Sequence, residues 1–451
     1  MEEYLKLVLE QVRCKKAHLQ IREELQTHME DQIAENLEKG MNRKEAEDAA
    51  VRDMGSPVET GIALDRIHRP QAAWGIITLM AVISVGAILV HLMISGQIKQ
   101  YAGGLSADST AFAMHTAVGF LLMLVVYRMD YSVIARFSKI FVAAMIMIGL
   151  YGLADGFTMH GVIRYVRTLG FKVSLFPMMM LCVPLYGAVI YKYYGMGYGG
   201  LVKSFLWMLV PVWITFKLPC WSLSMIMLVS MSVVLTVAVA KGWFQVAKKK
   251  VIAGLWSIVF VLPLASLAVA YFLGLLKTFQ TEMLKAFLTN SGDANYVTAM
   301  LRSILEDIHF VGNSGRELIT IESLPDFNSD FVFSYMLSTY GVLAGGIICC
   351  LLAVLVVKVF SISFRQKNQL GMSMGCGCGM ILLLNIVINI GECLGLLPVT
   401  QTFLPFFSAG GGNIIVCYVL MGLILSIYRY KNIHTAHINT KLPIVKLMIQ
   451  L

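Results

Sequence analysis

The chain has 451 residues, of which 57% are hydrophobic and 14% charged, and its formal net charge is +9. Its mean hydropathy of +0.72 excludes an ordinary soluble globular protein and predicts an all-α, polytopic membrane protein. Residues 1–70 hold 15 of the 27 acidic and 11 of the 36 basic residues, a net charge of −4, so the remainder carries +13. Basic excess beside apolar segments is typical of cytoplasmic loops, and we expect no nucleic-acid partner.

Residues 1–70 are predicted to form a small cytoplasmic helical domain. Asn42 and Glu45 form a capping-box pattern that opens one helix, and Ser56, followed by a proline and by Glu59, opens another. The segment that contains Met-Gly-Ser-Pro and Leu-Asp-Arg-Ile-His-Arg-Pro resembles the helical prefix domain attached to some bacterial permeases. This resemblance implies an interaction or regulatory module.

About ten apolar stretches follow this domain, each close to the ~20 residues that a helix needs to cross a bilayer. Lys and Arg gather in alternate loops, which we assign to the cytoplasm, and an even number of spans then places both termini inside. The sequence thus divides into the prefix domain, a membrane domain over residues 71–432 and a cytoplasmic tail over residues 433–451. The expected spans are 72–95, 109–127, 134–155, 173–193, 199–216, 219–240, 251–276, 331–358, 372–396 and 409–428.

Nine cysteines are present, among them Cys376 and Cys378 in a Gly-Cys-Gly-Cys-Gly run. No Cys-x-x-Cys pair occurs in the sequence, and the spacing of this run is wrong for a zinc site. Because most of the cysteines fall in apolar stretches, we expect them to be small, buried hydrophobic side chains.

Two loops on the predicted outer side differ from the others. The loop at 156–172 carries three basic residues, although such residues are rare on that side. The loop at 277–330 is long and holds 8 acidic residues against 4 basic ones, and loops of this length usually carry function. Apolar periodicity around residues 283–288 and 296–308 predicts helices that lie in the outer interface.

Two segments near the end of the chain carry the strongest functional signal. Residues 324–333 read Leu-Pro-Asp-Phe-Asn-Ser-Asp-Phe-Val-Phe and place Asp330 where the chain re-enters the membrane, where an acid needs water or a partner. Gly-Leu-Leu-Pro-Val-Thr at 395–400 is followed by Ser-Ala-Gly-Gly-Gly at 408–412. In this order the motifs resemble the signature of the SEDS family (shape, elongation, division and sporulation), whose members include FtsW, RodA and SpoVE. The resemblance covers roughly residues 72–430.

The resemblance implies a peptidoglycan glycosyltransferase that polymerises lipid II at the outer face of the bacterial cytoplasmic membrane, in division, elongation or sporulation. The implied partners are lipid II, a class B penicillin-binding protein and membrane lipids. By motif position, the family's essential aspartate falls on Asp330. Its expected role is to accept the proton of the acceptor hydroxyl, and apolar surroundings make a carboxylate a better base. From the residues alone, Asp330 could equally cap a helix that begins at Phe331.

Three basic residues are candidates for binding the pyrophosphate of the lipid-linked sugar. Arg164 falls on the family's basic loop motif, and a guanidinium binds phosphate oxygens through paired hydrogen bonds. A side chain that anchors the loop at the interface is the alternative for Arg164. Arg167 and Lys172 are weaker candidates for the same role.

Five further residues complete the candidate site. The turn with Ser408, Gly410 and Gly411 could bring backbone N–H groups to a ligand, or it could simply end a helix. Asp326 and Glu392 are candidate supporting acids, although an acid inside a span could also serve only its own partner. No cofactor follows with certainty, but Asp326 leaves a divalent cation, Mg²⁺ or Mn²⁺, as an open alternative.

The first half of the chain departs from the family pattern. Gln-Pro-Ser-Glu followed by Lys is expected near residues 172–180, which instead read Lys-Val-Ser-Leu-Phe-Pro-Met-Met-Met, and Lys-Leu-Pro-Cys at 217–220 replaces Gln-Pro-Asp. This divergence leaves open a non-catalytic scaffold for a class B penicillin-binding protein. A lipid II flippase is the third alternative, although we find no internal repeat of the kind that transporters carry.

Overall fold

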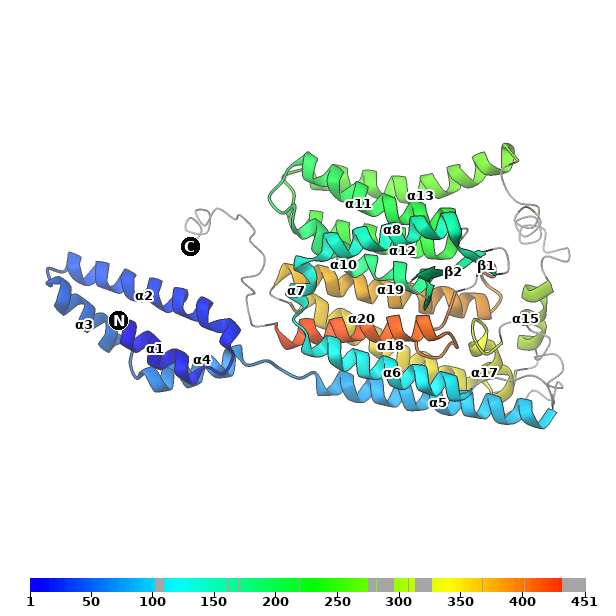
Figure 1. Ribbon diagram of the computed structural model, residues 1–451, viewed down its shortest axis with the longest axis horizontal. Coiled ribbons are helices and arrows are strands. Elements are labelled where there is room, and N and C mark those ends of the chain that lie inside the picture. Colours follow the sequence, from blue (N-terminus) through cyan, green and yellow to red (C-terminus); the bar gives the residue numbers. More distant parts are fainter. Residues whose placement is uncertain are drawn as a thin grey trace.

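A computed structural model describes the chain as a helical bundle joined by a short linker to a smaller helical lobe (Figure 1). The lobe contains the N-terminus and lies beyond one end of the bundle. At the other end lie a small sheet and the helix α15 (Tyr296–Glu306), which runs across the bundle axis. The described residues are 1–101, 109–159, 162–168, 171–218, 220–274, 281, 296–306, 308–312, 327–366, 368–400 and 402–431.

The N-terminal lobe is built from four helices, and side-chain caps begin the third and the fourth of them. Asn42 Oδ1 accepts the Glu45 N–H at 2.9 Å, and Glu45 accepts the Asn42 N–H at 3.3 Å, so the predicted capping box is present. Ser56 Oγ accepts the Glu59 N–H at 3.5 Å at the start of the last helix. The helices are α1 (Glu2–Gln11), α2 (His18–Glu38), α3 (Arg43–Asp53) and α4 (Pro57–His68), with a 3₁₀ turn at Lys15–Ala17.

Within its described residues, the chain contains nine helices that are long and apolar enough to cross a membrane, and a further apolar region made of two shorter helices. This arrangement confirms the predicted all-α, polytopic fold. The nine helices are α5 (Trp74–Tyr101), α6 (Ser109–Arg128), α8 (Ser138–Asp155), α11 (Tyr198–Lys217), α12 (Trp221–Ala240), α13 (Lys248–Phe272), α18 (Val342–Phe364), α19 (Gln369–Cys393) and α20 (Gly411–Arg429). The shorter helices are α7 (Tyr131–Arg136), α9 (Leu175–Met180), α10 (Cys182–Tyr191) and α17 (Val332–Tyr340).

The expected span at about 173–193 appears as one apolar helical region, Leu175–Tyr191, with an irregularity at Leu181 between α9 and α10. Pro184 lies in the first turn of α10 and has no N–H to donate to the carbonyl of Met180. A continuous helix would therefore lose a backbone hydrogen bond at this point. The short α9 directs its first turn toward the sheet end of the bundle.

The expected single span at 331–358 is wrong, because Gly341 separates α17 from α18 with a φ of 86°. The N–H of Val342 donates to the carbonyl of His309 at 3.0 Å. A Cβ on Gly341 would lie 2.8 Å from the carbonyl oxygens of His309 and Phe310. Another segment of the chain therefore crosses at the break, and only glycine leaves it room.

A three-stranded antiparallel sheet follows α8, where the sequence predicted only a loop. Val166 on the middle strand is fully buried, and its Cγ2 would lie 3.1 Å from a Cβ on Gly152 of α8. The sheet is thus fixed to the end of that helix. Its strands, in spatial order, are β1 (Phe157–Met159), β2 (Val162–Thr168) and β3 (Phe171–Ser174).

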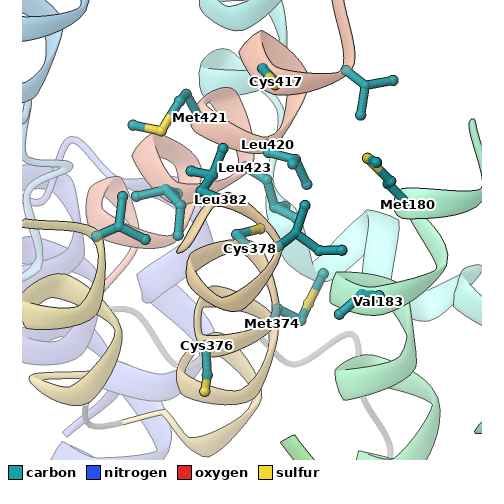
Figure 2. Packing of buried hydrophobic residues seen from close by; sticks show 14 of the residues in the cluster. Met180, Val183, Met374, Cys376, Cys378, Leu382, Cys417, Leu420, Met421 and Leu423 are labelled. Atoms are coloured by element: carbon teal, nitrogen blue, oxygen red, sulfur yellow. The ribbon is translucent and has the colours of Figure 1, made fainter. Parts of the chain in front are cut away.

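Helix α19 lies in the interior of the bundle, where it packs against α10, α12 and α18. A Cβ on Gly187 of α10 would lie 2.9 Å from the backbone carbonyl carbon of Ser373 in α19, so the two helices meet through their backbones. Seven of the nine cysteines are buried, as expected from their apolar surroundings. Figure 2 shows part of this core, with Met180, Val183, Met374, Cys376, Cys378, Leu382, Cys417, Leu420, Met421 and Leu423.

Candidate functional site

A cavity of about 220 Å³ lies at the sheet end of the bundle, where segments distant in the sequence meet. It is formed by β2, the end of β3 with the start of α9, the segment before α17 and the turn before α20. Asp330 is the one charged side chain among the described residues that line it. The lining residues are Tyr165, Ser174, Phe176, Pro177, Ser329, Asp330 and residues 409–413.

Asp330 is held in this cavity through its backbone. Its carbonyl oxygen accepts a hydrogen bond of 2.8 Å from Nδ2 of Asn389, a fully buried side chain of α19. The Cys393 thiol lies 3.6 Å from the same oxygen. The carboxylate itself is half-buried and faces the cavity. A buried amide in α19, the eighth of the nine long helices, therefore fixes where the candidate base lies.

The segment before α17 is also tied to the turn before α20. Ser329 Oγ lies 2.7 Å from the carbonyl oxygen of Ala409 and 3.2 Å from Oδ1 of Asp330. The Ala409 N–H donates to the carbonyl of Asn328 at 3.0 Å. These contacts bring residues some eighty positions apart into one wall of the cavity.

The helix-capping alternative for Asp330 is not what the fold shows. Helix α17 begins at Val332, its N-cap residue is Phe331, and no side chain makes a capping hydrogen bond there. Asp330 thus precedes the N-cap position of α17 and does not occupy it.

The glycine turn at 410–412 closes the cavity from the other side. Gly410 has a φ of 147°, in the region that favours glycine. A Cβ on Gly411 would lie 2.6 Å from the His115 ring, so this residue must also be small. Ser408, by contrast, is buried outside the lining, and its Oγ accepts the Leu404 N–H at 2.6 Å. Its hydroxyl stabilises the turn and does not face the cavity.

The three candidate basic residues lie on the strands of the sheet. Tyr165, which does line the cavity, pairs with Phe157, and Ile163 pairs with Thr158, so Arg164 is the extra residue of a β-bulge. Arg167 pairs with Lys172 across β2 and β3, and the Arg167 side chain is exposed. Arg164 is thus the chain neighbour of Tyr165, and Arg167 lies two residues after Tyr165 on β2.

Of the two candidate supporting acids, Glu392 and Asp326, the structure describes only Glu392. Glu392 is fully buried near the end of α19, and its carboxylate accepts a short hydrogen bond from Thr400. Asn389, one turn earlier, also donates to the Thr402 carbonyl at 3.0 Å. Glu392 therefore holds the loop after α19 and does not line the cavity. Asp326 lies outside the described residues.

Sequence reasoning missed several residues of this site. Asn389 carries a signal that could have revealed it, because an amide inside an apolar span is costly unless it is hydrogen-bonded. Tyr165, Ser174 and Asn413 carry no comparable signal, since only the folded chain brings them to Asp330. In the described part of the chain, no group of three His, Cys, Asp or Glu side chains could hold a metal ion.

Comparison with known sequences identifies one family. The profile of the cell cycle protein family of FtsW, RodA and SpoVE matches residues 72–433. The chain is 32% identical over 124 residues to the probable peptidoglycan glycosyltransferase FtsW of Enterococcus hirae, which is 27% of this chain and 31% of that protein. It is 30% identical over 111 residues to the peptidoglycan glycosyltransferase MrdB of Escherichia coli K12, which is 25% of this chain and 30% of that protein. The matches thus span less than a third of these relatives.

Solved structures extend the likeness over most of the chain. A chain of a peptidoglycan synthase complex, described for its coordination of polymerization and crosslinking, superposes with a TM-score of 0.64 at 19% identity. The match covers 80% of this chain and 98% of that one. The rod shape determining protein RodA of Thermus thermophilus superposes with a TM-score of 0.56 at 16% identity, over 80% of this chain and 97% of that one. At these identities the likeness establishes the fold.

Proposed function

The chain belongs to the cell cycle protein family of FtsW, RodA and SpoVE, and from this premise we propose that it is a peptidoglycan glycosyltransferase that polymerises lipid II. The observation that carries the proposal is the cavity in which Asp330 is the one charged residue of the described lining. The names of two matching relatives, FtsW and MrdB, supply the reaction class. The chain is a multi-pass membrane protein, and we place the reaction at the outer face of the cytoplasmic membrane, with both termini inside.

The proposed reaction joins two lipid-linked sugars. A hydroxyl of the acceptor attacks the anomeric carbon of the donor, a new C–O bond forms, and the bond to the pyrophosphate of the polyprenyl carrier breaks. The proton of the acceptor hydroxyl passes to the Asp330 carboxylate. A positioned general base of this kind contributes about 10²–10⁴-fold to the rate. The hydrogen bond from Asn389 to the Asp330 backbone supports this role, because it fixes the position of the base.

Charge on the departing pyrophosphate also needs stabilisation. We assign this to the basic residues of the sheet, Arg164, Arg167 and Lys172, whose strands border the cavity. The backbone N–H groups of the turn at 410–412 are a second source of positive potential, since they lie at the start of α20. Apolar faces of the surrounding helices would hold the polyprenyl chains.

A divalent cation would have to be held jointly by the protein and the substrate. Mg²⁺ is commonly bound by one or two carboxylates together with substrate phosphates. Asp330 is the described side chain that fits such a role, and Asp326 is the second candidate. A bound Mg²⁺ or Mn²⁺ would neutralise charge on the pyrophosphate, and no step above depends on it.

We further propose that the enzyme works with a class B penicillin-binding protein, because the peptidoglycan synthase complex with a similar fold couples polymerization to crosslinking. The N-terminal lobe, residues 1–70, is proposed to be a cytoplasmic interaction or regulatory module. Removal of residues 1–70 is expected to change localisation or activity in cells. Unchanged localisation and unchanged activity would contradict that role.

The test is polymerisation of labelled lipid II by the purified full chain, alone and with a class B partner. Asp330→Asn keeps the shape of the side chain and removes the base, so we expect a loss of about 10²–10⁴-fold. Asp155→Asn is the matched control. Asp155 is an exposed acid at the same end of the bundle, where it accepts a hydrogen bond from Tyr151 at 3.0 Å, and its loss should leave the rate unchanged.

One observation favours the non-catalytic scaffold as a second candidate. The cavity wall where the family pattern expects Glu and Lys is built from Ser174, Phe176 and Pro177. If the wild type makes no polymer while a typical family enzyme is active in parallel, the scaffold becomes the better assignment. Binding of a class B penicillin-binding protein would then be the property to measure.

A further inference from the structure

We propose that the junction between the N-terminal lobe and the bundle is a binding site for the phosphate headgroup of an anionic phospholipid. A cavity of about 580 Å³ lies there, at the opposite end of the bundle from Asp330. Its position is independent of the glycosyltransferase assignment. The residues that line it are Arg66, Arg69, Pro70, Gln71, Ala72 and Trp74.

The charge of this cavity suits a phosphate. Arg66 and Arg69 are both exposed and are three residues apart at the end of α4, so their side chains lie on the same side. Two guanidinium groups can bind phosphate oxygens through paired hydrogen bonds. None of the described residues that line the cavity is acidic. The nearest acid in the sequence, Asp65, is buried and bonded to Arg13, with the Arg13 N–H at 2.9 Å and Nε at 3.5 Å.

The level of this cavity relative to the membrane suits a lipid headgroup. Trp74 is the first residue of the first span, and 71% of its surface is exposed. Tryptophan at the end of a span lies at the level of the headgroups. A phosphate bound by the two arginines would therefore lie at the same level, with the acyl chains free to follow the apolar face of α5.

Two further cations lie at the same junction. A Cβ on Gly75 would lie 3.9 Å from Nζ of Lys358, which brings a basic side chain of α18 next to the first turn of α5. The Gln71 N–H donates to the carbonyl of Arg429 at 3.2 Å, so the end of α20 meets the linker. Nε of Arg429 is buried and has no hydrogen-bond partner in the described part of the chain. The Arg429 guanidinium lies over the Tyr127 ring, with its Cζ 4.9 Å from the ring centroid, so Arg66 and Arg69 remain the basic residues of the described lining.

A simpler interpretation is that Arg66 only complements the negative end of the α4 helix dipole. That interpretation predicts a stability change but no lipid preference. A soluble phosphate would share the same chemistry at the guanidinium groups. We propose the lipid because the cavity opens at the first residue of a span. The experiment distinguishes a bound lipid from a soluble phosphate and from a purely stabilising role of Arg66.

The experiment measures binding of dioleoyl-phosphatidylglycerol and of dioleoyl-phosphatidylcholine to the full chain in micelles, by native mass spectrometry. We expect the anionic lipid to bind more tightly. In the double variant Arg66→Gln, Arg69→Gln, its affinity should fall about 30-fold, since each basic residue near an anionic surface contributes a gain of about fivefold. Both arginines are exposed, so the variant should unfold at the wild-type temperature without lipid.

A second double variant, Arg43→Gln, Lys44→Gln, removes the same charge from the exposed start of α3. It should bind the anionic lipid as the wild type does. Equal loss in both double variants would overturn the proposal in favour of net charge alone. Equal affinity for the two lipids, or an unchanged affinity in the junction variant, would also overturn it. Displacement of the lipid by inorganic phosphate would assign the cavity to a soluble anion instead.

Discussion

Asn389 offers the sharpest test of how the site is built. Its Nδ2 donates to the carbonyl of Asp330 at 2.8 Å and to the carbonyl of Thr402 at 3.0 Å, and the side chain is fully buried. Replacing it by Ala removes both donors and leaves a cavity. The Cys393 thiol still lies 3.6 Å from the Asp330 carbonyl, so the Thr402 carbonyl is the acceptor most affected. A buried acceptor without a partner costs about 1–3 kcal/mol, and Asn389→Ala should lower the free energy of unfolding by about that amount.

The same substitution should slow polymerisation beyond its effect on stability. Asp330 would lose the contact that fixes its backbone, and a displacement of about 1 Å at a reacting group can cost about 100-fold in rate. Asn389→Asp is the second variant, because it keeps the side-chain volume and replaces the donor by an acceptor. We expect it to lose activity as Asn389→Ala does.

Asn385 is a matched control on the same helix. It is one turn earlier, 1% exposed, and donates only within its own helix, to the carbonyl of Ile381 at 2.8 Å. Asn385→Ala should therefore have the smaller effect on both measurements. The assays are thermal unfolding in detergent and lipid II polymerisation. If Asn389→Ala unfolded and polymerised as the wild type does, the positioning role of Asn389 would be refuted.

Two other substitutions test the packing and the capping described above. Gly187→Ala would place a Cβ 2.9 Å from the backbone of Ser373. Overpacking of this kind costs about 1–3 kcal/mol, so this variant should unfold at a lower temperature in detergent. In the control Gly346→Ala the new Cβ meets nothing within 4 Å, and this variant should unfold at the wild-type temperature. Equal midpoints for the two would contradict the close approach of α10 and α19. Asn42→Ala removes the capping box with Glu45 and should destabilise the N-terminal lobe by about 1 kcal/mol, measured by chemical denaturation; no change would show that the box is not stabilising.

The membrane fold could be predicted from the sequence because apolar length is a local property. An uninterrupted apolar run of about twenty residues predicts each long helix. The breaks at Leu181 and Gly341 could not be predicted in the same way. The apolar run near Leu181 has the same length whether or not Pro184 removes a backbone hydrogen bond. The apolar run near Gly341 has the same length whether or not the segment with His309 packs against it. The second cause is a tertiary contact, which hydropathy does not encode.

The small sheet had a local signal in its amino-acid types, which a hydropathy profile does not detect. Val162–Thr168 contains β-branched and aromatic residues that favour a strand. The three basic residues of this region instead suggested an irregular loop. The position of Arg164 in a β-bulge depends on the register between β1 and β2, and no sequence pattern gives that register.

Asp330 was predicted as the central site residue from its motif, and the fold places it in a cavity with Gly410 and Gly411. That placement leaves its catalytic role as a proposal. Ser408 is a neighbour of these glycines in the sequence but faces away from the cavity. The difference arises because the backbone reverses direction within the turn, where Phe406 has a φ of 70° and Gly410 a φ of 147°. Proximity in a motif therefore does not establish proximity in the site.

Helix α20 connects the Asp330 cavity at one end of the bundle with the linker to the N-terminal lobe at the other. It begins at Gly411, beside the Asp330 cavity, and ends at Arg429, whose carbonyl accepts the linker N–H of Gln71. Its 19 residues span about 28 Å, contain no proline, and pack along α6. We expect the pair to move as a stiff rod, so that a pull on the linker would displace the rim of the cavity. Labels at the two ends that moved independently of one another would argue against this mechanical coupling.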